Sequence, residues 1–401
     1  MKNRRLNRIK RWLRAGFSRV IDAIKPRTGV DARVRSALRL AGFDVLDGVP
    51  LGSQYARFEG AVFCFHINDW KRDLIRSWMS PCKLVFVPFK ESEADLVSGW
   101  LAAIESIPSS TALVWGMKLP AIAAEFFRLK GVPLSYVEDG FIRSVGLGSD
   151  RALPLSLNFD TRAPYFDASR PSDLEVLLSS YDFKSDHRLM ARASECMRKI
   201  IYGGLSKYNP VCRGEIGKIL GPRSEKRVLV VGQVEDDASI VHGSSIRYTN
   251  NDVVMLAKME HPDARIFYRP HPDVASGNRK MISNPEDVEH LCCVLWDDVS
   301  LPDLLGEVDH VYTITSQAGF EAAMRGIPVT VLGCPFYAGW GITDDRQPCL
   351  RRGRKLSVEE VFAASYILYP QYFDFLSRRR VDLEFVLDLL TKIRESGEKI
   401  A

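Results

Sequence analysis

The stretch VYTITSQAGFEA, residues 311–322, indicates the fold of this chain. Its first four residues, 311–314, have the β-branched and aromatic composition of a short buried strand. Small and polar residues follow at once and begin a helical pattern at Ser316. A strand that leads directly into a helix is the repeating unit of parallel α/β sheets, whose crossovers are right-handed.

The same strand-then-helix pattern recurs along most of the chain. Helical periodicity separates several of the strands, for example at 94–107 and 119–129. The pattern breaks once, from about 155 to 222, where turns surround a single helical stretch at 189–201. We therefore expect two Rossmann-like domains joined near 205–225. The predicted strands cover residues 61–65, 84–87, 112–115, 134–137, 228–231, 266–268, 294–296, 311–314 and 329–332.

The chain thus divides into four expected segments. They are a basic segment at 1–28, an N-terminal Rossmann-like domain at 29–215, a C-terminal Rossmann-like domain at 225–375 and a terminal segment at 376–401. The terminal segment has an amphipathic helical pattern, and we expect this helix to cross back onto the first domain.

The composition is that of an ordinary globular protein. The 401 residues are 46% hydrophobic and 26% charged, which excludes disordered, collagen-like and coiled-coil proteins. No run approaches the ~18 consecutive apolar residues that span a bilayer. The eight cysteines form no Cys-x-x-Cys pair, and the seven histidines do not cluster with them at the spacing of a zinc site. Scattered thiols without a secretory signal favour a cytoplasmic location.

The first 28 residues are strongly basic. They hold ten Lys or Arg residues against one acid, Asp22, and so exceed the +5 net charge of the whole chain. Six apolar residues recur at intervals of three and four, which predicts an amphipathic helix lying on an anionic membrane surface. The alternatives are a transit peptide, a helix packed on the protein itself, or nucleic-acid affinity, which the slightly acidic remainder disfavours. The apolar positions are Leu6, Ile9, Leu13, Phe17, Val20 and Ile24.

Polar segments follow five of the predicted strands, where an open parallel sheet binds its ligands. Acidic residues at such places often cap helices. A cap needs one carboxylate, however, and the run Glu235-Asp236-Asp237 supplies three that repel one another. The five segments begin at Glu138, Gly232, Arg269, Thr315 and Gly333.

Two of these segments suit an anion. Arg269 and His271 present two hydrogen-bond donors on a proline-stiffened turn, which favours phosphate, although a buried histidine bonded to backbone is the alternative. Small residues from Ser316 to Gly319 let a phosphate approach a helix start, and Glu321 is spaced to accept ribose hydroxyls. The aromatic loop at 337–341 either stacks on a base or sugar or anchors the domain surface.

These features together predict an α/β, GT-B-like fold with two facing Rossmann-like domains, parallel sheets and an interdomain cleft. No Gly-x-Gly-x-x-Gly fingerprint with an acid about 20 residues on is present, which argues against a dehydrogenase. No Gly-x-x-x-x-Gly-Lys-Ser/Thr motif is present either, which argues against a P-loop kinase.

Five motifs resemble those of the capsule-synthesis β-Kdo transferases of the KpsC/LipA type from Gram-negative bacteria. The resemblance covers roughly residues 130–345 and is weak in the N-terminal third. Members of that family usually carry two transferase modules in tandem, whereas this chain has room for one. Its Gln-Val-Glu-Asp-Asp run makes that module more similar to the second module of the family. The motifs are EDGFIRS (138–144), GQVEDDASI (232–240), YRPHP (268–272), SQAGFEA (316–322) and PFYAGWG (335–341).

The resemblance implies a retaining transferase that uses CMP-β-Kdo and works by double displacement. The family pattern Gln-x-x-x-Asp-x-Ser falls on Gln233, Asp237 and Ser239, which makes Asp237 the expected nucleophile and Asp236 the alternative. Glu138 is the expected acid/base residue, and Asp139 supports or orients it.

The resemblance also implies roles in donor binding. Arg269 and His271 would bind the phosphate of the departing CMP. Ser316, Gln317 and Glu321, beside Gly319, would hold phosphate and ribose, and Gln233 belongs to the same site. We add that Arg143 suits the carboxylate of Kdo.

No metal or other cofactor is expected, because CMP carries a single phosphate. The implied acceptor is a Kdo-bearing phosphatidylglycerol at the cytoplasmic face of the inner membrane, where the basic helix at 1–28 would hold the enzyme. The alternatives are another CMP- or UDP-sugar enzyme of the GT-B fold and a non-catalytic polysaccharide-binding or export component.

Overall fold

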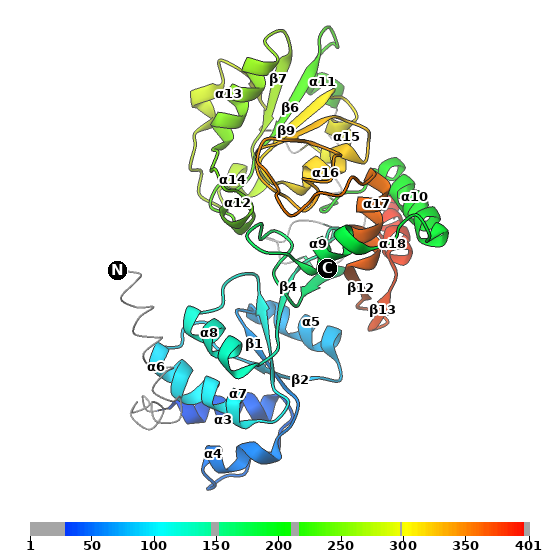
Figure 1. Cartoon of the computed structure of the whole chain (residues 1–401). Coiled ribbons are helices and arrows are strands. Elements are labelled where there is room, and N and C mark those ends of the chain that lie inside the picture. The colour runs from blue at the N-terminus through cyan, green and yellow to red at the C-terminus, as the bar shows by residue number, and fades with distance from the viewer. Residues whose placement is uncertain (1–28, 146–151, 210–215, 297–298, 397–401) are drawn as a thin grey trace. The chain divides into compact units, whose positions relative to one another are not determined.

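A computed structural model describes residues 29–145, 152–209, 216–296 and 299–396. The chain forms two compact units, one ending at Glu138 and the other beginning at Asp139 (Figure 1). The predicted basic helix at 1–28 lies outside the described residues. Among the helices in the described ranges, none combines the length and apolar character needed to cross a membrane.

The first unit contains four parallel strands in the order β4-β3-β1-β2. Helices surround these strands, and α3 buries one apolar face, which includes Val34. At Gly99 an added Cβ would lie 2.3 Å from a methyl group of Val30, so only glycine lets α3 come this close. The elements are α3 (Val30–Leu40), α4 (Leu51–Gln54), η1 (Tyr55–Arg57), β1 (Ala61–Phe65), α5 (Asp69–Met79), β2 (Lys83–Phe86), α6 (Glu93–Asp95), η2 (Leu96–Leu101), α7 (Ala102–Ser106), β3 (Thr111–Trp115), α8 (Ala121–Lys130) and β4 (Leu134–Asp139).

The second unit contains a six-stranded sheet in the order β8-β7-β6-β9-β10-β11. Every neighbouring pair in it is parallel, and in chain order this is the 3-2-1-4-5-6 arrangement of the Rossmann fold. The strands are β6 (Arg227–Val231), β7 (Arg265–Arg269), β8 (Cys293–Val294), β9 (His310–Thr313), β10 (Val329–Val331) and β11 (Asp344–Asp345).

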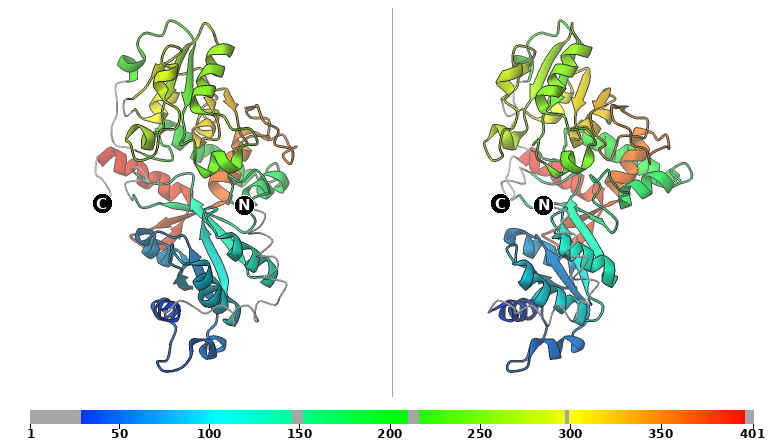
Figure 2. Two further views of the ribbon diagram at one scale, coloured as in Figure 1. Left: turned by 90° about the vertical axis from the view of Figure 1, so that its left-hand side faces the viewer. Right: turned by 60° about the vertical axis from the view of Figure 1, so that its left-hand side comes forward.

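Both faces of this sheet are covered, as expected for a parallel sheet (Figure 2). Along β6, Val228 and Val230 join the cluster that packs on α13, while Leu229 and Val231 join the cluster that packs on α15 and α16. The helices of this part are α12 (Ala238–Gly243), α13 (Asn250–Glu260), α14 (Pro272–Ala275), η4 (Pro285–Val288), α15 (Leu301–Leu305) and α16 (Gln317–Ala323).

The rest of the second unit comes from distant parts of the sequence. Strand β12 pairs antiparallel with β5 and with β13, which brings residues near 158 and 371 together. Helix α18 packs on α10 through the ion pairs Arg192–Glu384 and Lys199–Asp388, both 2.8 Å. The elements are β5 (Ser156–Asp160), α9 (Asp173–Ser180), α10 (His187–Tyr202), α11 (Ile216–Leu220), α17 (Val358–Phe362), η5 (Ala363–Leu368), β12 (Pro370–Asp374), β13 (Arg379–Val381) and α18 (Leu383–Ser396).

The predicted α/β, GT-B-like class is confirmed, and each predicted strand overlaps an observed one. The two units divide at Glu138, whereas the expected join lay near 205–225. Within the second unit, β5 and α10 pack on β12, α17 and α18. The terminal helix does pack on α10, which lies inside the expected first domain of 29–215, but both helices belong to the second unit.

Candidate functional site

The chain order of the six-stranded sheet reverses between β6 and β9, and open α/β sheets bind ligands outside the strand ends at such a point. Gln233 follows β6, and Thr315 follows β9. The buried side chain of Gln233 donates a hydrogen bond to Thr315 Oγ1 (3.0 Å) and accepts one from the backbone N–H of Thr315 (2.7 Å). Gln233 therefore ties the two strand ends together, a positioning role that leaves its amide little capacity for a donor substrate.

The three adjacent carboxylates after β6 have three different environments. Glu235 accepts hydrogen bonds from the backbone N–H groups of Asn250 (2.6 Å) and Ser283 (2.8 Å), so it fixes neighbouring segments. Asp236 is exposed and forms an ion pair with Arg279 (2.9 Å). Asp237 is half-buried and caps α12. The repulsion expected from three adjacent acids is thus relieved by separate partners.

The side chain of Asp237 is held through one of its two oxygens. Its Oδ1 accepts hydrogen bonds from the backbone N–H (2.9 Å) and the hydroxyl (2.7 Å) of Ser239. Within the described ranges, its Oδ2 has no hydrogen-bond partner. A hydrogen bond of 3.4 Å joins Thr315 Oγ1 to Ser239 Oγ. The family pattern on Gln233, Asp237 and Ser239 is therefore one connected chain of hydrogen bonds, which fixes the carboxylate and leaves one oxygen available.

His271 lies in the same neighbourhood, after β7. Its Nδ1 accepts a hydrogen bond from the backbone N–H of Asp273 (3.1 Å), so the neutral ring carries its proton on Nε2. Burial lowers the pKa of His271, while the charges of Asp273 and Asp237 oppose that shift. The neutral imidazole is therefore a donor at Nε2, which suits an anionic ligand.

Arg269 stands at the end of β7, next to β6. Its Nη2 donates a hydrogen bond to the backbone carbonyl of Val299 (3.0 Å), and its own carbonyl accepts one from the N–H of Gly232 (2.9 Å). A Cβ at Gly232 would lie 2.9 Å from the ring of Tyr268 and 3.0 Å from the carbonyl oxygen of Arg269, so glycine is needed there. The two predicted anion-binding residues, Arg269 and His271, therefore lie on one turn beside the Asp237 loop.

Lys207 is a cation of this site that motif reasoning missed. Burial opposes its charged form, but Tyr208, Tyr165 and Asp139 outweigh that effect and raise the pKa of Lys207 above its usual value. Its charge in turn lowers the pKa of His271. A single lysine in an irregular segment carries no spacing signal, and only the folded chain brings it near His271.

The predicted partner for the Kdo carboxylate, Arg143, is buried. Its Nε forms an ion pair with Asp139 (3.0 Å), and its Nη1 donates a hydrogen bond to Ser144 Oγ (2.8 Å). Its backbone N–H donates to the carbonyl of Lys207 (3.1 Å). Arg143 therefore orients Asp139 and the Lys207 segment, and its guanidinium is not presented to a ligand.

The helix start at Ser316 is also occupied by internal contacts. Ser316 Oγ accepts from the N–H of Ala318 (3.2 Å), and its carbonyl accepts from the hydroxyl of Tyr337 (2.5 Å). Gln317 donates to the carbonyl of Phe141 (2.7 Å) and to the hydroxyl of Tyr366 (3.0 Å). These bonds serve packing, so the phosphate role expected for Ser316 and Gln317 has no support in their contacts.

Glu321 and Gly319 likewise face the interior. Glu321 is 2% exposed and accepts hydrogen bonds from Ser206 Oγ and from the N–H of Lys207, both 3.1 Å. Burial raises the pKa of Glu321. A Cβ at Gly319 would lie 2.2 Å from the hydroxyl of Tyr337, so a side chain at this position would collide with that ring. One oxygen of Glu321 thus holds the Lys207 backbone, and the expected contact with a ribose stays a prediction.

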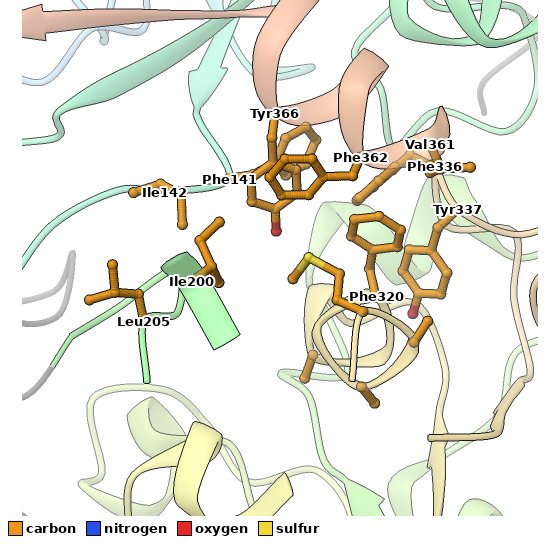
Figure 3. Close-up of a cluster of buried hydrophobic side chains, with 14 of the residues drawn as sticks. Phe141, Ile142, Ile200, Leu205, Phe320, Phe336, Tyr337, Val361, Phe362 and Tyr366 are labelled. Atoms are coloured by element: carbon orange, nitrogen blue, oxygen red, sulfur yellow. The ribbon is translucent and has the colours of Figure 1, made fainter. Parts of the chain in front are cut away.

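The aromatic loop at 337–341 anchors the unit, the second of the two readings of its sequence. Tyr337 and Trp340 are fully buried, and Phe336 lies 4.5 Å from Phe141 between ring centroids. Figure 3 shows Phe320 between this loop and the rings of α17 and η5. The aromatic cluster thus packs against the start of α16, where the hydroxyl of Tyr337 donates to the carbonyl of Ser316.

Glu138, the expected acid/base residue, is the last residue of the first unit and lies on β4. A Cβ on Gly116, after β3, would lie 2.7 Å from Glu138 Oε1, so the Glu138 side chain passes close over Gly116, whose φ of 63° favours glycine. Its neighbour Asp139 belongs to the second unit. In the described ranges, no group of three His, Cys, Asp or Glu side chains could hold a metal ion.

Comparisons with known proteins place these residues in a family. The family model for "capsule polysaccharide biosynthesis protein" matches residues 111–372. The chain is 49% identical over 311 residues to the lipopolysaccharide-processing protein LpsZ of Rhizobium meliloti, covering 78% of this chain and 70% of that protein. It is 35% identical over 356 residues to the capsule polysaccharide modification protein LipA of Neisseria meningitidis, covering 87% of this chain and 48% of that protein. The chain therefore spans about half the length of LipA.

Two solved structures of Thermosulfurimonas dismutans KpsC are similar over most of both chains. The β-Kdo 2,4 transferase matches with a TM-score of 0.70 and 32% identity, over 83% of this chain and 98% of the other. The β-Kdo 2,7 transferase matches with a TM-score of 0.65 and 30% identity, over 83% of this chain and 99% of the other. The resemblance predicted from the motifs is thereby confirmed, and the chain belongs to the capsule polysaccharide biosynthesis protein family.

Proposed function

We propose that the chain is a retaining β-Kdo glycosyltransferase that transfers Kdo from CMP-β-Kdo to a Kdo-bearing acceptor. The observation that carries this proposal is the environment of Asp237, whose Oδ1 is bound by Ser239 while its Oδ2 is available. The similarity to two KpsC β-Kdo transferases over nearly their whole length supports the same reaction.

Asp237 acts as the nucleophile. Its Oδ2 attacks the anomeric carbon of Kdo, the bond from that carbon to the CMP phosphate oxygen breaks, and a glycosyl–Asp237 ester forms. The acceptor hydroxyl then attacks the same carbon, loses its proton and releases the carboxylate. Two inversions give net retention. Asp236 is the weaker candidate, because it is exposed and paired with Arg279.

The leaving phosphate requires fixed cations and hydrogen-bond donors. His271 offers Nε2–H, Arg269 contributes the positive charge of its guanidinium at the end of β7, and Lys207 adds a positive charge to the same neighbourhood. These groups stabilise the charge that develops on CMP. A single phosphate with such partners needs no divalent cation, so we propose a metal-independent reaction.

Glu138 is proposed to accept the proton of the acceptor hydroxyl in the second step. Asp139, held by Arg143, contributes fixed negative charge next to it in the sequence. The acceptor would be a Kdo-bearing lipid at the cytoplasmic face of the inner membrane, with the enzyme bound there through its basic segment at 1–28.

Mass spectrometry of the intact protein tests the donor, the mechanism and the nucleophile together. The chain is incubated with CMP-Kdo without acceptor and then digested for peptide mapping. A mass increment of one Kdo residue on the peptide that contains Asp236 and Asp237 is expected, and Asp237→Asn should lose it while Asp236→Asn keeps it. No adduct, together with no CMP release when a Kdo-lipid is supplied, would rule the proposal out.

A further inference from the structure

Strands β12 and β13 of the second unit form a hairpin (Figure 1). It carries an exposed leucine beside three exposed arginines. The turn between the strands is Phe375–Arg378, and Leu376 at its tip is 93% exposed. The chain then continues with Arg378, Arg379 and Arg380, all exposed. The hairpin thus places one large apolar side chain next to three exposed side chains of the same charge.

The turn is shaped by one buried carboxylate. Asp374 accepts hydrogen bonds from the N–H groups of Leu376 (3.1 Å) and Ser377 (3.2 Å) and from the hydroxyl of Ser377 (2.5 Å). The pKa of Asp374 is lowered, because these hydrogen bonds and the charge of Arg379 outweigh the effect of burial. Hydrogen bonds to Asp374 therefore fix the turn that exposes Leu376. The Asp374 carboxylate accepts these bonds and so stabilises the turn.

The arginines have little compensation within the described part of the chain. Arg379 lies opposite Asp374 in the hairpin register, and Arg380 lies opposite Phe373. In the described ranges, neither the side chain of Arg378 nor that of Arg380 has an ion-pair or hydrogen-bond partner. The nearest other acid along the chain, Asp382, caps α18 through the N–H of Phe385 (2.9 Å). The tip thus presents positive charge together with an apolar side chain.

A hollow of about 350 Å³ adjoins the base of the hairpin. Leu368, Leu383 and Arg380 are among the residues that line it, so its wall also combines apolar groups with a guanidinium. Edge strands often carry charged residues that prevent pairing with other chains, and β13 is such an edge. Edge protection accounts for the arginines but not for the exposed leucine at the tip.

We infer that this hairpin, residues 375–381, is a contact surface for an anionic phospholipid bilayer. Guanidinium groups bind lipid phosphates bidentately, and Leu376 inserts between the head groups into the apolar boundary. The hairpin is far in the sequence from the basic segment at 1–28, and the inference does not depend on the transferase reaction.

Local hydrogen–deuterium exchange of the full chain tests the inference even if another segment also binds the membrane. With phosphatidylglycerol vesicles, exchange in peptides covering 375–381 is expected to slow, and with pure phosphatidylcholine vesicles it should not change. Unchanged exchange in the hairpin, while the protein sediments with the anionic vesicles, would assign binding elsewhere and overturn the inference. Absence of sedimentation would also overturn it.

Matched variants separate the leucine from the charges. Leu376→Ser is expected to weaken sedimentation with anionic vesicles several-fold and to remove the local protection. The control Leu350→Ser changes a leucine that is 92% exposed on another loop and should have no effect. Arg378→Gln, Arg379→Gln and Arg380→Gln are expected to weaken binding roughly fivefold each. The charge-matched control is Lys184→Gln, Arg188→Gln and Arg247→Gln at exposed positions.

Binding of a soluble polyanion tests whether the ligand of the hairpin is a lipid surface or a charged polymer. If dextran sulfate protects the hairpin as well as the vesicles do, and Leu376→Ser leaves that protection unchanged, the surface binds acidic polysaccharide and the lipid inference fails. Protection that requires both anionic lipid and Leu376 supports the inference.

Discussion

Ser239 binds one oxygen of Asp237 twice, through its N–H at 2.9 Å and its hydroxyl at 2.7 Å. The two bonds orient the carboxylate that we propose as the nucleophile. Ser239→Ala removes the hydroxyl but keeps the backbone bond. Because hydrogen bonds to a charged group contribute about 1.5–3 kcal/mol, we expect adduct formation from CMP-Kdo to slow by at least tenfold.

Rapid-quench mass spectrometry of the adduct measures the Ser239→Ala effect. Ser283→Ala is the control, since its hydroxyl donates to Glu235 in the neighbouring loop. An equal loss of rate in both variants would show that general loosening of the loops, and not orientation of Asp237, sets the rate.

The two candidate nucleophiles differ in a way that substitution resolves. Asparagine caps helices about as well as aspartate, so Asp237→Asn should fold normally and lose transfer by three orders of magnitude or more. Asp236→Asn removes an exposed ion pair worth at most about 1 kcal/mol and should retain most of the activity. CMP release in the presence of acceptor measures both, with circular dichroism as the check on folding. Activity in Asp237→Asn would refute the assignment.

Replacement of Lys207 should change the pKa of the neighbouring His271 imidazole. Burial lowers the pKa of His271 most, and the charge of Lys207 adds to that shift, so Lys207→Met should raise this pKa. Affinity for CMP should fall about tenfold through loss of a charged partner for the phosphate. NMR titration of the histidine rings and calorimetry with CMP check the two effects. Cytidine, which has no phosphate, should bind both forms alike.

A matched lysine provides the control for the Lys207 experiment. Lys226 lies 3.3 Å from His261 Nδ1 and lowers the pKa of that ring after burial. Lys226→Met should therefore raise the pKa of His261 and leave that of His271 unchanged. A His271 pKa that stays the same in Lys207→Met would mean that the lysine does not act on the site.

The free energy of unfolding should decrease when the pH is lowered from neutral, because of His310. Burial, and then the charges of His261 and Lys226, lower the pKa of His310 to about 4. The unfolded chain, with an ordinary pKa near 6.5, binds more protons between these values, so the free energy of unfolding decreases as pH falls from about 6.5 to 4. After allowance for solvent screening, we expect a loss of about 1 kcal/mol.

Urea unfolding at pH 7 and pH 5 measures the His310 contribution. His310→Gln keeps a partner for Thr330, which lies 2.9 Å from Nε2, and should reduce the pH dependence. His290→Gln, at an exposed position, should leave it unchanged. An identical slope in His310→Gln and the parent chain would contradict the assignment.

The sequence predicted what depends on neighbours along the chain. Runs such as Val228–Val231 are apolar on both faces, which identifies buried parallel strands without further information. The pairing of β12 with β5 joins segments more than 200 residues apart, and no local pattern announces it. For that reason a division at Glu138 does not follow from local patterns alone.

The site was predicted unevenly for a similar physical reason. Asp237, Arg269 and His271 follow strands, and the direction of parallel strands brings them to one edge. Gln317 and Glu321 are four residues apart on α16, so they share a face, but composition did not reveal that this face points inward. The backbone of Lys207 is held at the site by hydrogen bonds with Glu321, Arg143 and Ser144, which lie far from it in the sequence.

The hydrogen bonds between Gln233 and Thr315 have a consequence for how the site unfolds. They join β6, at the centre of the sheet, to its neighbour β9, so the anchor of Asp237 belongs to the part of the unit that opens last. Loss of the nucleophile's geometry then coincides with cooperative unfolding of the whole sheet. We therefore expect no populated state in which the helices persist while the carboxylate has lost its position.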